Sequence, residues 1–194
     1  MKRSHAIVYS LTLFLLFSLS VRAQSQKAEM KRFAKEGLAF DYPVIWTLED
    51  RSQEKAQHLI LLRGSSGAQI MFIVQRETIT TPDQQAAARR AITEPLIDAM
   101  EKEFERLGTR SERSTATIAV GGAQAEGVRL RAVLDGVPGS AEVYSLLLGG
   151  RVVALTFIGS DTELKAAAVD WETIRRSVKV EATTPPAKSE KQAN

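Results

Sequence analysis

One histidine is the main candidate for acid–base chemistry in the body of the chain. His58 is one of only two histidines among 194 residues, and the other, His5, lies in an N-terminal segment that we expect to be removed. A serine–histidine–aspartate triad would need His58. The sequence contains no G-x-S-x-G motif to present a nucleophilic serine. His58 also follows a charged turn, so we expect a solvated side chain at the start of a strand.

The composition excludes several other kinds of site. The chain has no cysteine, which removes thiolate nucleophiles, redox pairs, iron–sulfur clusters and cysteine-ligated zinc. A single histidine cannot supply the nitrogen ligands of a histidine-based zinc site. No EF-hand loop, Walker loop or G-x-G-x-x-G motif is present. We therefore expect neither a metal nor a cofactor.

Charged side chains provide two weaker candidates. Asp98, Glu101 and Glu105 are predicted to share one helix face, either as carboxylates for glycosidic cleavage or as a solvated face. Arg129 and Arg131 alternate with apolar residues and so leave one face of a strand. They form either a clamp for an anionic ligand or a rim whose aliphatic stems cover apolar surface. The solvated and rim interpretations are the ordinary ones.

Hydrophobic periodicity predicts the elements that position these residues. A small hairpin over residues 33–42, broken at Gly37, precedes a group of strands, a helical region from Thr81 to Gly108 and a second group of strands. The predicted strands of these two groups are residues 45–48, 58–63, 69–76, 114–120, 125–134, 141–148 and 151–158. Short glycine turns between neighbours indicate antiparallel pairing.

Two helices are predicted by their caps and apolar stripes. Thr81 and Pro82 are typical of a helix start, while Pro95 should kink or split this first helix. A capping box begins the second helix at Ser160, and this helix should bury Leu164, Ala167, Ala168, Trp171, Ile174 and Val178. Because residues 151–158 are apolar on both faces, their strand should be covered on both sides. We expect an α/β protein of the α+β type, with an antiparallel sheet between helix layers (α-β-α).

The N-terminus has the pattern of a signal peptide. A basic start precedes an apolar stretch of sixteen residues, 6–21, and Ala23 closes a small-residue cleavage pattern. A spanning helix prefers about 20 apolar residues, so we expect cleavage between Ala23 and Gln24, export to the periplasm or medium, and no membrane span afterwards. Retention as an anchor is the alternative.

Cleavage changes the charge and sets the domain limits. The net charge of +3 depends on three cations within residues 1–23, so the remainder is close to neutral. Its charges are interleaved, which is unlike a nucleic-acid-binding surface. We divide the chain into a signal peptide at 1–23, a leader at 24–32, a folded domain at 33–181 and a disordered, proline-containing tail at 183–194.

The start of the domain carries a family motif. Gly37, Phe40, Tyr42, Pro43 and Trp46 follow the pattern G-x-x-F-x-Y-P-x-x-W, which resembles the opening of PsbP-like and DcrB-like exported proteins. The resemblance implies an antiparallel sheet between helix layers and brings no common active site. The aromatic residues of the motif could line a ligand groove, but we expect Pro43 to form a corner and Trp46 to pack in the core.

Two functions remain open at this point. The first is an exported, non-enzymatic binding or accessory domain whose partner is a protein, a lipid or a small molecule of the cell envelope. The second is an envelope hydrolase that uses an unrecognised carboxylate site. A pocket with converging carboxylates would favour the hydrolase.

Overall fold

The computed structural model describes residues 29–52 and 57–181. These residues form β1 (Met30–Lys35), β2 (Leu38–Pro43), β3 (Thr47–Asp50), β4 (Gln57–Arg63), β5 (Gln69–Gln75), α2 (Pro82–Arg106), β6 (Glu112–Val120), β7 (Ala123–Leu134), β8 (Val137–Leu148), β9 (Arg151–Ser160), α3 (Asp161–Ser177) and β10 (Lys179–Val180). The expected signal peptide, the Ala23–Gln24 cleavage site and the tail at 183–194 lie outside the described residues.

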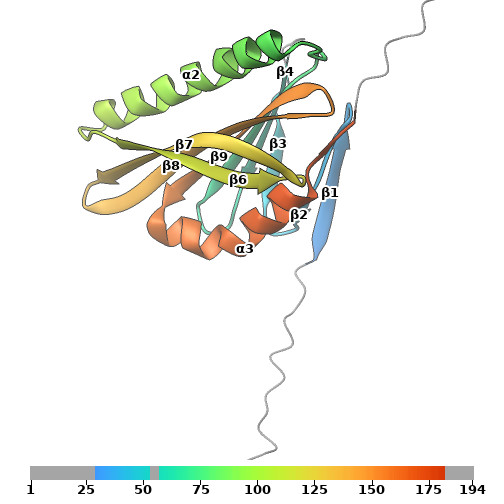
Figure 1. The fold of residues 1–194 in the computed structure, drawn as a ribbon. Helices are drawn as coiled ribbons and strands as arrows, with labels where there is room; N and C mark the ends of the chain where they lie inside the picture. Colours follow the sequence, from blue (N-terminus) through green and yellow to red (C-terminus); the bar gives the residue numbers. More distant parts are fainter. Residues whose placement is uncertain (1–28, 53–56, 182–194) are drawn as a thin grey trace, which may run out of the picture.

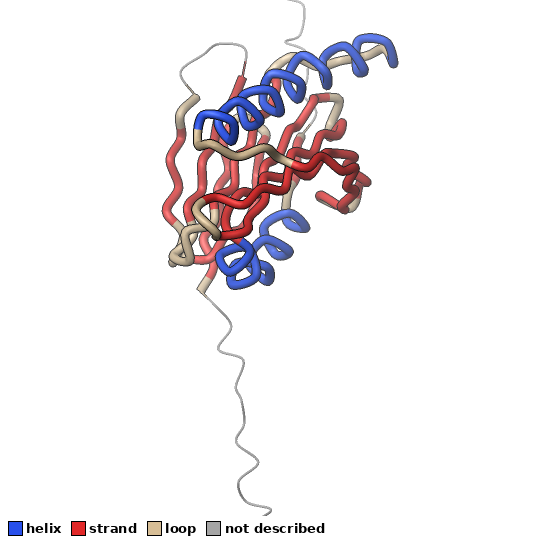
Figure 2. The backbone as a smooth tube through the Cα atoms, turned by 90° about the vertical axis from the view of Figure 1, so that its left-hand side faces the viewer, coloured by secondary structure: helices blue, strands red, loops and turns tan. Residues whose placement is uncertain are grey.

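Two antiparallel sheets make up the fold. The large sheet has seven strands in the order β3-β4-β5-β9-β8-β7-β6, and the small sheet has the order β1-β2-β10. In Figure 1 the long α2 lies on one side of the large sheet, and α3 lies on the other side together with the small sheet. Figure 2 shows the same arrangement from a second direction, with strands between the two helices. The expected antiparallel strands and two helices are confirmed, but within residues 29–52 and 57–181 only one helix lies on each side of the large sheet.

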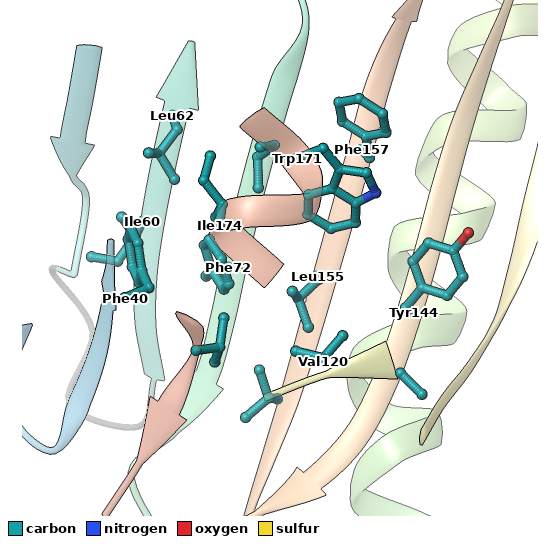
Figure 3. Packing of buried hydrophobic residues seen from close by; sticks show 14 of the residues in the cluster. Phe40, Ile60, Leu62, Phe72, Val120, Tyr144, Leu155, Phe157, Trp171 and Ile174 are labelled. Carbon is teal, nitrogen blue, oxygen red and sulfur yellow. The ribbon is translucent and has the colours of Figure 1, made fainter. Parts of the chain in front are cut away.

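The central strand β9 supplies apolar side chains to both faces, as its sequence predicted. Val153 and Leu155 belong to the large cluster on the α3 side, whereas Val152 and Ala154 pack on the α2 side. Figure 3 shows the large cluster, in which Leu155 lies among aromatic side chains from several elements. The ring of Trp171 stacks on Phe157, with 4.9 Å between centroids. Burial on both faces therefore fixes β9 as a central strand.

The small sheet begins earlier than the sequence predicted and ends with an extra strand. β1 starts at Met30, so the last residues of the expected leader, 30–32, are part of a strand. Lys179 pairs with Ala39, and Val180 pairs with Leu38. Neither feature has a periodic signature, because β1 is mostly exposed and β10 contains two residues. Both are formed by pairing with β2.

Several details of the predicted elements need correction. Residues 45 and 46 form a turn, and β3 begins at Thr47. α2 runs unbroken through Pro95, so the predicted split is wrong. Pro95 is exposed, which allows water to bind the carbonyl that its missing N–H leaves unpaired. In α3 the capping box of Ser160 and Glu163 is present, but Ala168 is exposed rather than buried.

The motif residues attach the small sheet to the rest of the fold. Phe40 is fully buried and stacks on Phe72 of β5, with 4.6 Å between centroids. Trp46 is also buried, and its indole N–H donates to Asp170 of α3 at 2.8 Å. A Cβ at Gly64 would lie 2.9 Å from the Trp46 ring, so the glycine leaves room for the indole. These contacts favour the structural interpretation of the motif, which stays a prediction.

Replacing Trp46 should destabilise the protein. Trp46→Ala removes a buried indole and leaves Asp170 without its donor, so we expect a loss of about 3–5 kcal/mol in the free energy of unfolding. Trp46→Phe keeps most of the packing and should cost less. Urea denaturation measures both, with Val169→Ala on the exposed side of α3 as the control. An alanine variant as stable as the control would contradict a structural role.

Candidate functional site

His58 is buried, which corrects the expected solvated histidine. Its side chain is 1% exposed and lies under the turn between β1 and β2. Glu36 in that turn has a carboxylate oxygen, Oε2, 2.5 Å from His58 Nε2 and 3.0 Å from Arg76 Nε. No pattern around His58 indicates this arrangement, because Glu36 lies in another part of the chain. We expected His58 to contact water, but the turn that carries Glu36 covers it.

A buried arginine completes this site. Arg151 of β9 is 2% exposed, and its Nε donates to the carbonyl oxygen of Gln75 at 2.7 Å. Its Nη1 donates to the carbonyl oxygen of Glu36 at 2.9 Å. We call Glu36, His58, Arg76 and Arg151 the Glu36 cluster. In this cluster the Glu36 carboxylate contacts His58 and Arg76, and the Glu36 carbonyl oxygen accepts a hydrogen bond from Arg151.

The protonation of His58 follows from its surroundings. Burial lowers the pKa of His58 below its ordinary value near 6.5, and Arg76 and Arg151 lower it further, while Glu36 and the more distant Asp50 act in the opposite direction. Nδ1 of His58 is buried and has no hydrogen-bond partner among the described residues. The 2.5 Å contact between Nε2 and the Glu36 carboxylate is that of a neutral imidazole with its proton on Nε2. Arg76 Nε has the geometry of a donor to the same nitrogen, at 3.3 Å, and lies 3.0 Å from the Glu36 carboxylate.

The two arginines proposed for an anion clamp both have carboxylate partners. Arg129 Nε donates to Glu142 at 2.7 Å, and Arg131 makes two hydrogen bonds to Asp161 at 3.2 and 2.6 Å. Glu142 also accepts a hydrogen bond from the Tyr144 hydroxyl at 2.6 Å. The anion clamp stays a prediction, but an anion would have to displace these carboxylates. The ion pairs favour the rim interpretation.

The carboxylates on α2 do not gather around a pocket. Asp98 and Glu105 are exposed, and Glu101 lies 4.0 Å from Arg113 of β6. Among the described residues, no group of three or more histidine, cysteine, aspartate or glutamate side chains could hold a metal ion. Neither α2 nor α3 combines the length and the hydropathy that a membrane-spanning helix needs.

An apolar hollow lies at the end of the β7–β8 hairpin. It has a volume of about 270 Å³ and is lined mainly by Phe104, Ala132, Leu134, Val137 and Ile158. Val137 is 55% exposed and stands at its opening. The carboxylate that reaches the lining, that of Glu163, is occupied by the backbone N–H and hydroxyl of Ser160. The hollow therefore offers apolar contact without a free acid.

Sequence reasoning missed this hollow because its lining comes from five elements, α2, β7, β8, β9 and α3. Phe104 was predicted only as part of the apolar stripe of a helix, and Val137 lay in a predicted turn. The one available signal was the run Val133, Leu134 and Val137 around Asp135-Gly136, which places apolar residues at a hairpin tip. Packing of α2 against the sheet turns this run into a concave surface.

Solved structures of other proteins are similar to this chain. No protein-family model and no curated protein matches the sequence. The solution structure of cyanobacterial PsbP (CyanoP) from Synechocystis sp. PCC 6803 is similar over 84% of this chain and 99% of that protein, with 14% identity and a TM-score of 0.48. CyanoP is a PsbP protein, the kind of protein that the motif resembles.

A second similar structure is a crystal structure of a protein from Bacteroides thetaiotaomicron VPI-5482. The match covers 78% of this chain and 48% of that protein, with 10% identity and a TM-score of 0.50. The chain thus spans about half the length of that protein. At such identities the similarity concerns the fold alone, and the resemblance to DcrB-like proteins stays a prediction.

Because His58 is buried in the Glu36 cluster, we expect the protein to be less stable in mild acid. Because the pKa of His58 is lower in the folded protein than in the unfolded chain, the unfolded chain binds the proton more tightly. The contribution of neutral His58 to the free energy of unfolding is complete above a pH of about 6.5. It is lost as the pH falls below that value. We therefore expect the free energy of unfolding to decrease as the pH is lowered from about 7.5 to about 5.5.

His58→Gln is the matched variant for this prediction. Glutamine stays neutral and retains a side-chain N–H for Glu36, so its urea-unfolding profile should be flatter over the same pH range. His58→Ala should cost about 1–3 kcal/mol at neutral pH, because Glu36 and Arg76 lose a buried neighbour. Equal pH slopes for the wild type and His58→Gln would rule out His58 as the titrating group.

Proposed function

We propose that this chain is an exported, non-enzymatic binding domain of the cell envelope that uses the apolar hollow to hold a side chain of a protein partner. The observation that carries the proposal is the hollow itself, with exposed Val137 at its opening and Phe104 in its wall. An apolar concavity on a protein surface is typical of a binding site.

The size of the hollow favours a protein partner over a lipid or small molecule. Pockets for drug-sized ligands have volumes of roughly 300–1,000 Å³, whereas this hollow measures about 270 Å³. One large apolar or aromatic side chain suits such a volume, and side chains of this kind dominate the energy of protein interfaces. We therefore choose the protein among the three partner classes that the sequence left open.

The hydrolase remains the alternative, and the arrangement of acids argues against it. A carboxylate mechanism needs two acids that converge on a substrate. Asp98 and Glu105 are exposed on α2, while Glu163 is bonded to its own helix cap. A screen with esterase, phosphatase, glycosidase and peptidase substrates tests this alternative. Turnover that is lost on mutating Asp98, Glu101 or Glu105 would establish it.

Substitution at the opening of the hollow tests the binding proposal. Val137→Glu places a carboxylate where the partner side chain must enter, so we expect binding to weaken at least about tenfold, or about 1.4 kcal/mol. Val169→Glu is the matched control, because Val169 is 77% exposed and does not line the hollow. In-cell crosslinking with mass spectrometry identifies the partner, and titration of the purified pair measures affinity. Equal affinities for both variants would contradict the proposal.

Export is the other half of the proposal and has its own test. The short apolar segment and the small residue at Ala23 support removal of residues 1–23. The intact mass of the protein purified from the cell envelope should correspond to a chain that begins at Gln24. A species that keeps residues 1–23 would show that the segment is retained as an anchor.

A further inference from the structure

The edge strand β6 has open backbone groups on its outer side. β6 is the last strand of the large sheet and pairs only with β7 among the described residues. Its first four residues are exposed, and residues 114–120 carry no charge. Long edge strands in natural proteins are usually protected by charges, proline or a covering element, because they pair readily with another strand. β6 therefore has the features of a pairing surface.

The hairpin between β6 and β7 determines which residues face outward. Gly121 and Gly122 form a two-residue turn with φ angles of +57° and +85°, and Val120 pairs with Ala123. In such a hairpin the residues beside the turn exchange backbone hydrogen bonds, and the pattern then alternates along the strand. The outward positions are consequently residues 113, 115, 117 and 119.

The neighbouring helices leave three of these positions open. The guanidinium of Arg175 in α3 donates to the carbonyl oxygen of Ala119, which closes the end of the strand beside the turn. α2 packs mainly over β7, β8 and β9, and it reaches β6 through Glu101, whose carboxylate lies 4.0 Å from the Arg113 guanidinium. Arg113, Thr115 and Thr117 thus keep accessible outward backbone groups, all with exposed side chains.

We propose that β6 pairs antiparallel with β6 of a second copy, with Thr115 opposite Thr115 on the two-fold axis. This register places Arg113 opposite Thr117 and uses all three open positions on each copy. A shift that moves the axis to Arg113 would place two arginines opposite each other, which is unfavourable. A shift that moves the axis to Thr117 would place Thr115 opposite Ala119. The carbonyl oxygen of Ala119 already accepts a hydrogen bond from Arg175 and could not pair with the second copy. Among the registers whose axis passes through an outward residue, the charge pattern and the covered end thus favour this one.

A second copy suits this edge better than an unrelated extended peptide. An isologous interface requires a self-complementary surface, and the uncharged segment 114–120 meets its own sequence without opposed like charges. Threonine opposite threonine is a favourable cross-strand pair. Pairing would join two large sheets into one continuous sheet, with both copies of α2 on the same face.

Cysteine substitution tests the register directly, because the chain contains no native cysteine. In the proposed pair the two Thr115 Cα atoms are about 5.5 Å apart, within the usual disulfide range of about 4.4–6.8 Å. Two Thr117 residues would lie four positions out of register, or about 13 Å apart. With oxidised glutathione, Thr115→Cys should form crosslinked dimers at least about tenfold faster than the matched Thr117→Cys.

A proline variant tests the pairing without a crosslink. Thr115→Pro removes an outward N–H that β7 does not use, so the monomer should fold with an unchanged circular dichroism spectrum. Sedimentation should show a dimer for the wild type and a monomer for Thr115→Pro. A wild type that is monomeric at all concentrations, or equal crosslinking by the two cysteine variants, would overturn the proposal. A crosslink from Thr115→Cys to another envelope protein would assign the edge to that partner and overturn the second copy as its occupant.

Discussion

The buried guanidinium of Arg151 is the constraint on which the position of the small sheet depends. A charge that is 2% exposed needs hydrogen-bond acceptors around it, and two of these are the carbonyl oxygens of Gln75 and Glu36. The second acceptor is present only when the β1–β2 turn lies against β9. Glu36 has a φ angle of +48°, which costs about 1 kcal/mol or more for a non-glycine residue. The turn tolerates this strain because it completes the bonding of a buried cation.

The same turn joins segments from both ends of the domain. Gly37 has a φ angle of +80°, and its carbonyl accepts a hydrogen bond from the backbone N–H of Glu181 at 2.9 Å. A Cβ at Gly37 would lie 3.3 Å from Arg151 Nη1, so a side chain there would crowd the guanidinium. The first residue of the family motif is therefore explained by a turn conformation and a close approach. Its role is to hold β1, β2 and β10 in place.

Local patterns in the sequence predicted the elements well, whereas contacts between distant residues could not be predicted. The capping box at Ser160, the two apolar faces of β9 and the glycine turns each depend on residues close together in the chain. His58 was misjudged because its partner, Glu36, lies 22 positions earlier and reaches it through a turn. Arg129 and Arg131 alternated as predicted, but their carboxylate partners come from β8 and α3. Periodicity tells which face a residue occupies and does not tell what covers that face.

The two faces of the large sheet are covered to different extents, and this difference determines where partners can bind. On one face, α3 and the small sheet together enclose a continuous cluster that includes Phe40 and Trp171. On the other face α2 is alone, ends at Arg106 and contributes only Phe104 to the wall of the hollow. Apolar side chains at the β7–β8 tip are therefore left without a cover, and the outer side of β6 has no neighbour within the described residues. The hollow and the open edge thus have one physical origin, because this sheet extends beyond the elements that cover it.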